Sequence, residues 1–94
     1  MRNKEGKIRI FGQDYRVTRR RYRDDGVLHY GHCDHALGVI NLNPESRKSQ
    51  AEQTLLHEII HIIDNELRLN FSEKQVTQLS SGLYSVLRDN NIFK

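Results

Sequence analysis

The sequence predicts an α+β domain in which a small antiparallel sheet of about three or four strands is followed by two helices. Short segments of alternating apolar and polar residues fill the first half of the chain, up to Leu42. The second half contains two segments whose apolar residues recur at helical spacing. The chain has 94 residues, so it has room for one small domain, residues 1–94.

The strands are expected between residues 7 and 42. Residues 7–11 and 15–18 alternate on either side of a turn that begins at Gly12, which predicts a hairpin. Residues 27–31 and 38–42 predict a third and a fourth strand around a turn near Asp34 and His35.

The first helix is predicted at about residues 46–67. Pro44 is well suited to the first turn of a helix, and Ser49 with Glu52 has the spacing of a capping box, so the helix is expected to start between Pro44 and Ala51. Asn70 is a candidate for the left-handed residue that ends this helix.

The second helix is predicted at about residues 73–89, because Ser72 and Gln75 form another capping signature. Five apolar residues recur at helical spacing and are expected to line one face of it: Val76, Leu79, Leu83, Val86 and Leu87.

The first helix carries the sequence His57-Glu58-Ile59-Ile60-His61, which reads H-E-x-x-H. Residues four apart lie on the same face of a helix, so both imidazoles can bind one metal ion. This is the pattern of a zinc-dependent hydrolase, in which His57 and His61 bind Zn²⁺ and Glu58 activates the metal-bound water and moves its proton. Two histidines and a glutamate in so apolar a helix need partners or a metal.

A catalytic zinc usually has three protein ligands, so a third is expected. Glu73 at the start of the second helix is the first choice, although in a strictly antiparallel helix pair Gln78 would lie nearer the level of His61. The helices must therefore cross at a considerable angle. Asp64 lies on the face of His57 and His61 but roughly 10 Å beyond His57, and is better placed to orient a histidine.

A cluster of metal-binding side chains between the third and fourth strands is the other source of a ligand. Strand alternation places His29 and Cys33 on one face and His32 on the other, so the cluster, which also includes Asp34, is not expected to act as one unit. Tyr84 is a weaker candidate for stabilising a developing oxyanion, since a helix tyrosine more often packs in the core.

The helix with H-E-x-x-H, the strands before it and Glu73 after it resemble a minimal zincin related to the ImmA/IrrE-type metallopeptidases. Small phage and prophage proteins are more similar still, over most of the chain from Lys7 to Asn90, through residues 30–34, 54–61 and 82–90. The resemblance implies that Glu73 completes the zinc site. It also implies a cytoplasmic peptidase that acts on a protein such as a repressor.

Composition narrows the other possibilities. Cys33 is the only cysteine, which excludes an internal disulfide and fits a reducing compartment. No apolar segment is long enough to span a membrane, and the N-terminus lacks the apolar stretch of a signal peptide, so a cytoplasmic location is expected. The net charge is +3, and much of the excess lies in an arginine-rich segment that is expected to be solvated: Arg16, Arg19, Arg20, Arg21 and Arg23.

Three functions are therefore compared. The first is a zinc metallopeptidase that hydrolyses a protein or peptide substrate, with residues 38–42 pairing with an extended substrate. The second is a non-catalytic, metal-stabilised accessory or partner-binding module. The third, binding of nucleic acid through the arginine-rich segment, is the weakest because only Tyr15 and Tyr22 accompany it.

Overall fold

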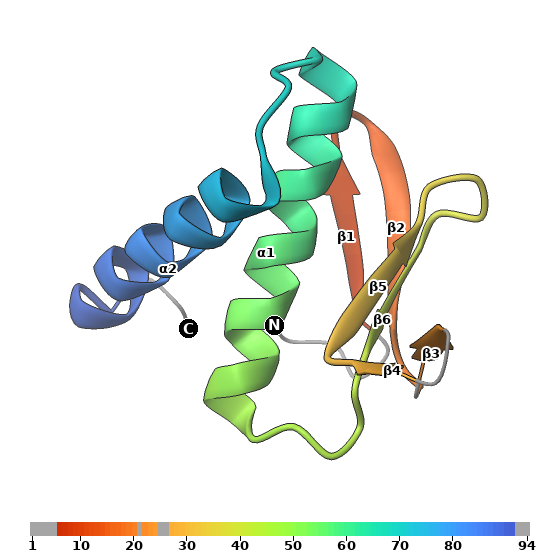
Figure 1. The fold of residues 1–94 in the computed structure, drawn as a ribbon, viewed down its shortest axis with the longest axis horizontal. Helices are drawn as coiled ribbons and strands as arrows, with labels where there is room; N and C mark the ends of the chain where they lie inside the picture. Colours follow the sequence, from red (N-terminus) through yellow and green to blue (C-terminus); the bar gives the residue numbers. More distant parts are fainter. Residues whose placement is uncertain (1–5, 21, 25–26, 92–94) are drawn as a thin grey trace.

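The computed structural model describes residues 6–20, 22–24 and 27–91, and only the backbone of 22–24 and 27–29. Its elements follow in this order: β1 (Lys7–Ile10), β2 (Gln13–Arg19), β3 (Tyr22–Asp24), β4 (Val27–His29), β5 (Gly31–Asp34), β6 (Val39–Leu42), α1 (Lys48–Leu67) and α2 (Glu73–Asp89). Helix α1 packs on the sheet, and α2 projects away from α1 at a wide angle (Figure 1). The predicted α+β architecture is confirmed.

The main sheet is mixed, which corrects the prediction of an antiparallel sheet. Its strand order is β1-β2-β6-β5, and β2 pairs with β6 in parallel, with Val17 opposite Ile40. The other two pairs of this sheet are antiparallel. The connection from β2 to β6 is long and includes β3 and β4, which form a separate two-stranded sheet. Because of its length, the chain can return beside β2 in the same direction, which gives the parallel pair.

The predicted first hairpin is confirmed, with Ile8 opposite Tyr15. Its turn consists of Phe11 and Gly12, whose φ angles are 51° and 80°. Left-handed φ at both turn residues suits the twist of an antiparallel pair, and it lets β2 begin at Gln13, earlier than expected.

The predicted third strand, residues 27–31, is divided in two. Residues 27–29 form β4 and pair with β3, whereas Gly31 begins β5, which pairs with β6. The turn after β5 lies where it was predicted. The N–H of Gly38 donates to the carbonyl of Asp34 at 2.9 Å, and the carboxylate of Asp34 accepts from the N–H of Leu37 at 3.1 Å.

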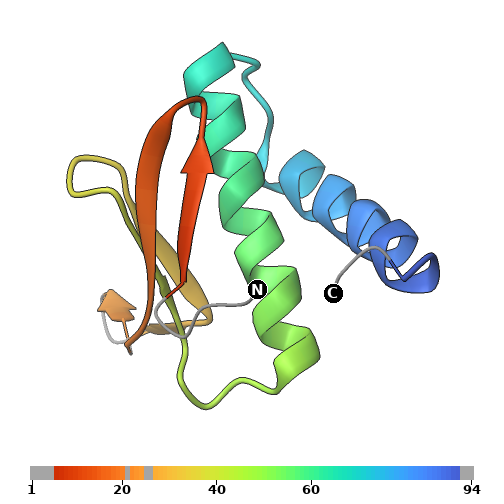
Figure 2. The ribbon, with the colours of Figure 1, turned by 180° about the vertical axis from the view of Figure 1, so that it is seen from behind.

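The core lies between α1 and the sheet, as the view from behind shows (Figure 2). Helix α1 contributes its apolar face, which packs on inward-facing residues of β2 and β6. The buried residues of this core are Tyr15, Val17, Ile40, Leu42, Ala51, Leu55 and Ile62. Their burial fixes the rotation of α1, because the opposite, more polar face then turns away from the sheet.

The termini of α1 differ from the prediction. Its N-cap is Arg47, with no capping hydrogen bond from a side chain, and Ser49 lies within the helix, so the predicted capping box at Ser49 and Glu52 is wrong. The left-handed C-cap is Arg68, at φ 55°, while Asn70 is also left-handed at φ 64° and bends the chain toward α2.

Helix α2 has the predicted capping box, in which the Ser72 hydroxyl accepts from the N–H of Gln75 and the Gln75 side chain accepts from the N–H of Ser72. Its predicted buried face is only partly correct. Val76 is buried together with Ser80 and Tyr84, whereas three of the five expected apolar residues are exposed: Leu79, Leu83 and Val86. The angle between the two helices explains the exposure of these three side chains, because α2 contacts α1 along a narrow line of residues and the three lie outside it.

Within the described residues, neither helix combines the length and apolar character needed to cross a membrane.

Candidate metal centre

Three side chains from the two helices meet at one point beside α1. Nε2 of His57 lies 2.9 Å from Oε2 of Glu73, and Nε2 of His61 lies 2.9 Å from Oε1 of the same carboxylate. The two imidazole rings are 4.8 Å apart between centroids and are inclined at 66°. Among the described residues these three form the group whose ligand atoms all lie within 4.8 Å of one another. The structure therefore places together all three residues that the sequence predicted as ligands.

Both helices contribute to this convergence. The spacing of four residues turns both histidines to the same side of α1, and burial of Leu55 and Ile62 directs that side away from the sheet. Glu73 is the first residue of α2, whose start is fixed by the capping box at Ser72. The objection that Gln78 would be level with His61 does not hold, because Glu73 at the start of α2 contacts both histidines. Helix α2 runs at a wide angle to α1 (Figure 1).

The donor set fits a zinc ion. Zinc takes imidazole nitrogen and carboxylate oxygen at about 2.0–2.2 Å, and in tetrahedral geometry its ligand atoms are about 3.3 Å apart. The two 2.9 Å contacts are made by different oxygens of Glu73, and the ligand atoms lie within 4.8 Å of one another, so they would have to draw closer together around an ion. The Glu73 side chain is 68% exposed and has room to move. Two imidazoles and one carboxylate also match the ligand types of catalytic zinc sites, which keep a fourth position for water.

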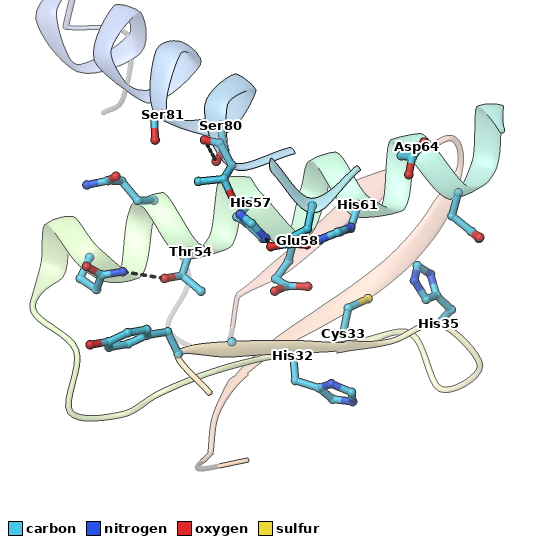
Figure 3. Close-up of a pocket in the computed structure, with 17 residues that line it drawn as sticks. His32, Cys33, His35, Thr54, His57, Glu58, His61, Asp64, Ser80 and Ser81 are labelled. Atoms are coloured by element: carbon cyan, nitrogen blue, oxygen red, sulfur yellow. Dashed lines mark hydrogen bonds and ion pairs between the residues drawn. The ribbon is translucent and has the colours of Figure 1, made fainter. Parts of the chain in front are cut away.

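Glu58 lies between the histidines in sequence but points in a different direction, from α1 toward β5 (Figure 3). It is one of the four buried polar or charged residues found among the described part of the chain. Burial raises the pKa of its carboxyl, the charges of His57, His61 and His32 oppose that rise, and Glu73 adds to it. A carboxylate with a raised pKa is better suited to exchange protons near neutral pH.

A close approach of β5 to α1 positions Glu58. A Cβ atom added at Gly31 would lie 2.4 Å from Cγ2 of Thr54 and 3.4 Å from Oε2 of Glu58, so only glycine fits there without a shift. Sequence reasoning did not identify Gly31 or Thr54 as part of the site. The available signal was Gly31 at the start of a strand, since glycine in a strand often marks a close approach of another segment. Thr54, its contact, lies one helical turn before Glu58 on α1.

The group formed by His57, His61 and Glu73 opens into a cleft of about 770 Å³. One side is formed by β5 and its flanking residues, the floor by α1, and the other side by the first half of α2. Thr54, His57, Glu58, His61 and Asp64 follow one another along the floor, with Ser80 and Ser81 above them (Figure 3).

The cluster on β5 does not supply a ligand to this group. Cys33 points toward α1 and His32 points to the opposite side of the strand (Figure 3), as strand alternation predicted. Burial raises the pKa of the Cys33 thiol to about 12, with Glu58 and Asp34 contributing, so the thiol stays protonated at neutral pH. The side chain of His29 lies outside the described residues.

Two further predictions concern supporting residues. Asp64 lines the cleft, but its carboxylate accepts from the N–H of Phe71 at 3.1 Å, so it fixes the connection to α2 rather than orienting a histidine. The Tyr84 hydroxyl donates to the carboxylate of Glu52 at 2.9 Å and does not line the cleft, so the oxyanion role suggested for Tyr84 is wrong.

Of the arginine-rich segment, Arg16, Arg19 and Arg20 are exposed, as predicted, and the side chains of Arg21 and Arg23 lie outside the described residues. None of the three described arginines lines the cleft.

No family model matches the chain, and a search of curated proteins and of solved structures found no match.

Proposed function

We propose that this protein is a zinc-dependent metallopeptidase that hydrolyses a peptide bond in a protein substrate. The observation that carries the proposal is the contact of one carboxylate, Glu73, with Nε2 of both His57 and His61, beside the buried acid Glu58 in an open cleft. When bound, zinc supplies a Lewis acid that polarises the scissile carbonyl and makes water a stronger nucleophile at neutral pH.

The roles of the chain's own residues follow from their positions. His57, His61 and Glu73 hold the ion. Glu58 accepts a proton from the attacking water and later gives it to the leaving amine, and its raised pKa favours both transfers near neutral pH.

The substrate is expected to extend along β5. The sequence analysis assigned substrate pairing to residues 38–42, but this strand, β6, is hydrogen-bonded to both β2 and β5 and has no open edge. Strand β5 is the last strand of the sheet and lines the cleft, so its backbone is the one that can add an extended peptide.

A second candidate is a non-catalytic module that binds metal for stability. It is favoured by the limited burial of α2, in which only Val76, Ser80 and Tyr84 are buried among 17 residues. A metal bound by Glu73 and the α1 histidines would then hold α2 against the rest of the domain.

The Glu58→Gln variant separates the two candidates, because glutamine keeps the shape of the side chain and removes its base. Zinc-loaded wild type and variant are incubated with an unfolded protein mixture, and products are identified by mass spectrometry. A peptidase is expected to lose hydrolysis by about a thousandfold in the variant with zinc content unchanged. Equal product formation by both proteins would contradict the role of Glu58, and zinc-stabilised protein without any products would favour the second candidate.

A further inference from the structure

One side of helix α2 carries large apolar side chains that are exposed. Leu79, Leu83 and Val86 are 43%, 42% and 53% exposed, and their spacing of four and three residues places them on the same side of the helix. We call these three residues the apolar strip. The part of α2 that carries them projects away from the rest of the domain, so the strip is accessible (Figure 1).

The apolar strip has the properties of a helix-packing surface. Single exposed leucines are common on proteins, whereas apolar residues that adjoin one another more often mark a contact surface. Spacings of four and three residues are those of side chains that pack between two helices. Of the α2 residues three or four positions from a member of the strip, only Asp89 at the C-terminal end is charged. A second helix can therefore cover the strip without burying charged groups along most of its length.

Gly82 indicates which helix fits the strip. Glycine destabilises the interior of a helix, and a Cβ atom at this position would have nothing within 4 Å, so packing within one chain does not require glycine here. Its missing side chain leaves a gap beside Leu83, which projects from the strip. If two copies of α2 lie antiparallel, centred between residues 82 and 83, each Leu83 faces the partner's Gly82 and each Leu79 faces the partner's Val86. The surface is thus complementary to itself, as a twofold interface requires.

We propose that this protein forms a twofold dimer in which the apolar strips of two antiparallel α2 helices pack together. The antiparallel arrangement places the positive end of each helix dipole beside the negative end of the other. Helix α2 has 17 residues and is therefore about 25 Å long and 10–12 Å wide, so the contact buries several hundred Å² per copy. Stable dimers bury about 800 Å² per copy, and this dimer is accordingly weak and reversible.

Dimerisation through the strip leaves the cleft open. The residues of α2 that line the cleft lie outside the strip and are Glu73, Thr77, Ser80 and Ser81. The dimer is therefore compatible with the proposed peptidase function and does not depend on it.

Sedimentation equilibrium of the full chain tests the dimer, at protein concentrations from about 5 μM to about 1 mM. A chelator is present throughout, so that metal ions cannot bridge two copies. The wild type is expected to pass from monomer to dimer with a dissociation constant on the order of 100 μM. A protein that stays monomeric up to 1 mM would overturn the inference.

Two variants locate the interface and its register. Leu83→Glu places two carboxylates close to the twofold axis, and Gly82→Leu fills the gap that receives the partner's Leu83, so each is expected to weaken the dimer by more than tenfold. Leu67→Glu is the control, because Leu67 is also exposed, at 53%, but lies at the end of α1. Circular dichroism verifies that each variant is folded. Dimerisation of folded Leu83→Glu or Gly82→Leu protein as tight as that of the wild type would overturn the inference, as would an equal loss in Leu67→Glu.

Discussion

Nε2 of His61 lies 2.9 Å from Oε1 of Glu73, so the first residue of α2 contacts a histidine on α1 that precedes it by twelve residues. Of the α2 side chains, only those of Val76, Ser80 and Tyr84 are buried, so α2 packs on the rest of the domain along a narrow line. The contact of Glu73 with His61 therefore adds a second point of attachment between α2 and α1. A metal ion at this point would join α1 and α2.

Zinc is expected to stabilise the protein through this junction. At a free zinc concentration about a hundred times the dissociation constant, binding adds about 2.7 kcal/mol to the free energy of unfolding, which raises Tm by about 10 °C or more. Glu73→Gln should lose most of that increase when Tm is measured by circular dichroism. Asp89→Asn, at the other end of α2, is the control and should keep it.

Glu58 is expected to destabilise the metal-free fold at neutral pH. Its pKa is raised by burial, so the stabilising contribution of the protonated carboxyl is complete below the unfolded value of 4.5 and is lost as pH rises through the folded pKa. Glu58→Gln should therefore raise the free energy of unfolding by roughly 1 kcal/mol at about pH 7.5 and have less effect near pH 4. Urea unfolding at the two pH values measures this, and a variant less stable at pH 7.5 would show that the ionised carboxylate is well compensated.

Gly31→Ala is expected to destabilise the protein by about 1–3 kcal/mol, because the new Cβ would lie 2.4 Å from Cγ2 of Thr54. Thr54→Ser removes that methyl and keeps the hydroxyl that accepts from Gln50, so the double variant should recover much of the loss. The control is Gly82→Ala, which has nothing within 4 Å and should stabilise α2 by about 0.5–1 kcal/mol. Additive effects of the Gly31 and Thr54 substitutions in urea unfolding would mean that the two positions do not interact.

Tyr84→Phe is expected to cost about 1 kcal/mol of stability, because it removes the hydrogen bond to Glu52 between the two helices. The measurement is urea unfolding, with Tyr30→Phe, whose residue is 63% exposed, as the neutral control. If hydrolysis of a peptide fell a hundredfold or more in Tyr84→Phe while zinc affinity and stability stayed unchanged, a direct role in catalysis would replace the structural one.

Local patterns in the sequence were enough to predict both helices, the first hairpin and the convergence of His57, His61 and Glu73. The spacing of His57 and His61 determines their shared face, and the capping signature at Ser72 places Glu73 at a helix start. These are short-range properties, which the chain encodes within one or two helical turns.

Features that depend on distant contacts could not be predicted in this way. The parallel pairing of β2 with β6 depends on the course of the chain between them, and alternation is the same in parallel and antiparallel strands. The exposure of Leu79, Leu83 and Val86 likewise depends on the angle between the helices. The contact of Gly31 with Thr54 joins residues whose individual patterns are ordinary.

The most direct measurement is the zinc content of the purified chain after dialysis, together with its affinity determined by competition against a coloured chelator. The account predicts about one zinc ion per chain in the wild type, and affinity lowered by more than tenfold in His57→Ala, His61→Ala and Glu73→Ala. Wild-type protein that binds no zinc, or variants that bind it as tightly as the wild type, would contradict the assignment of this metal centre.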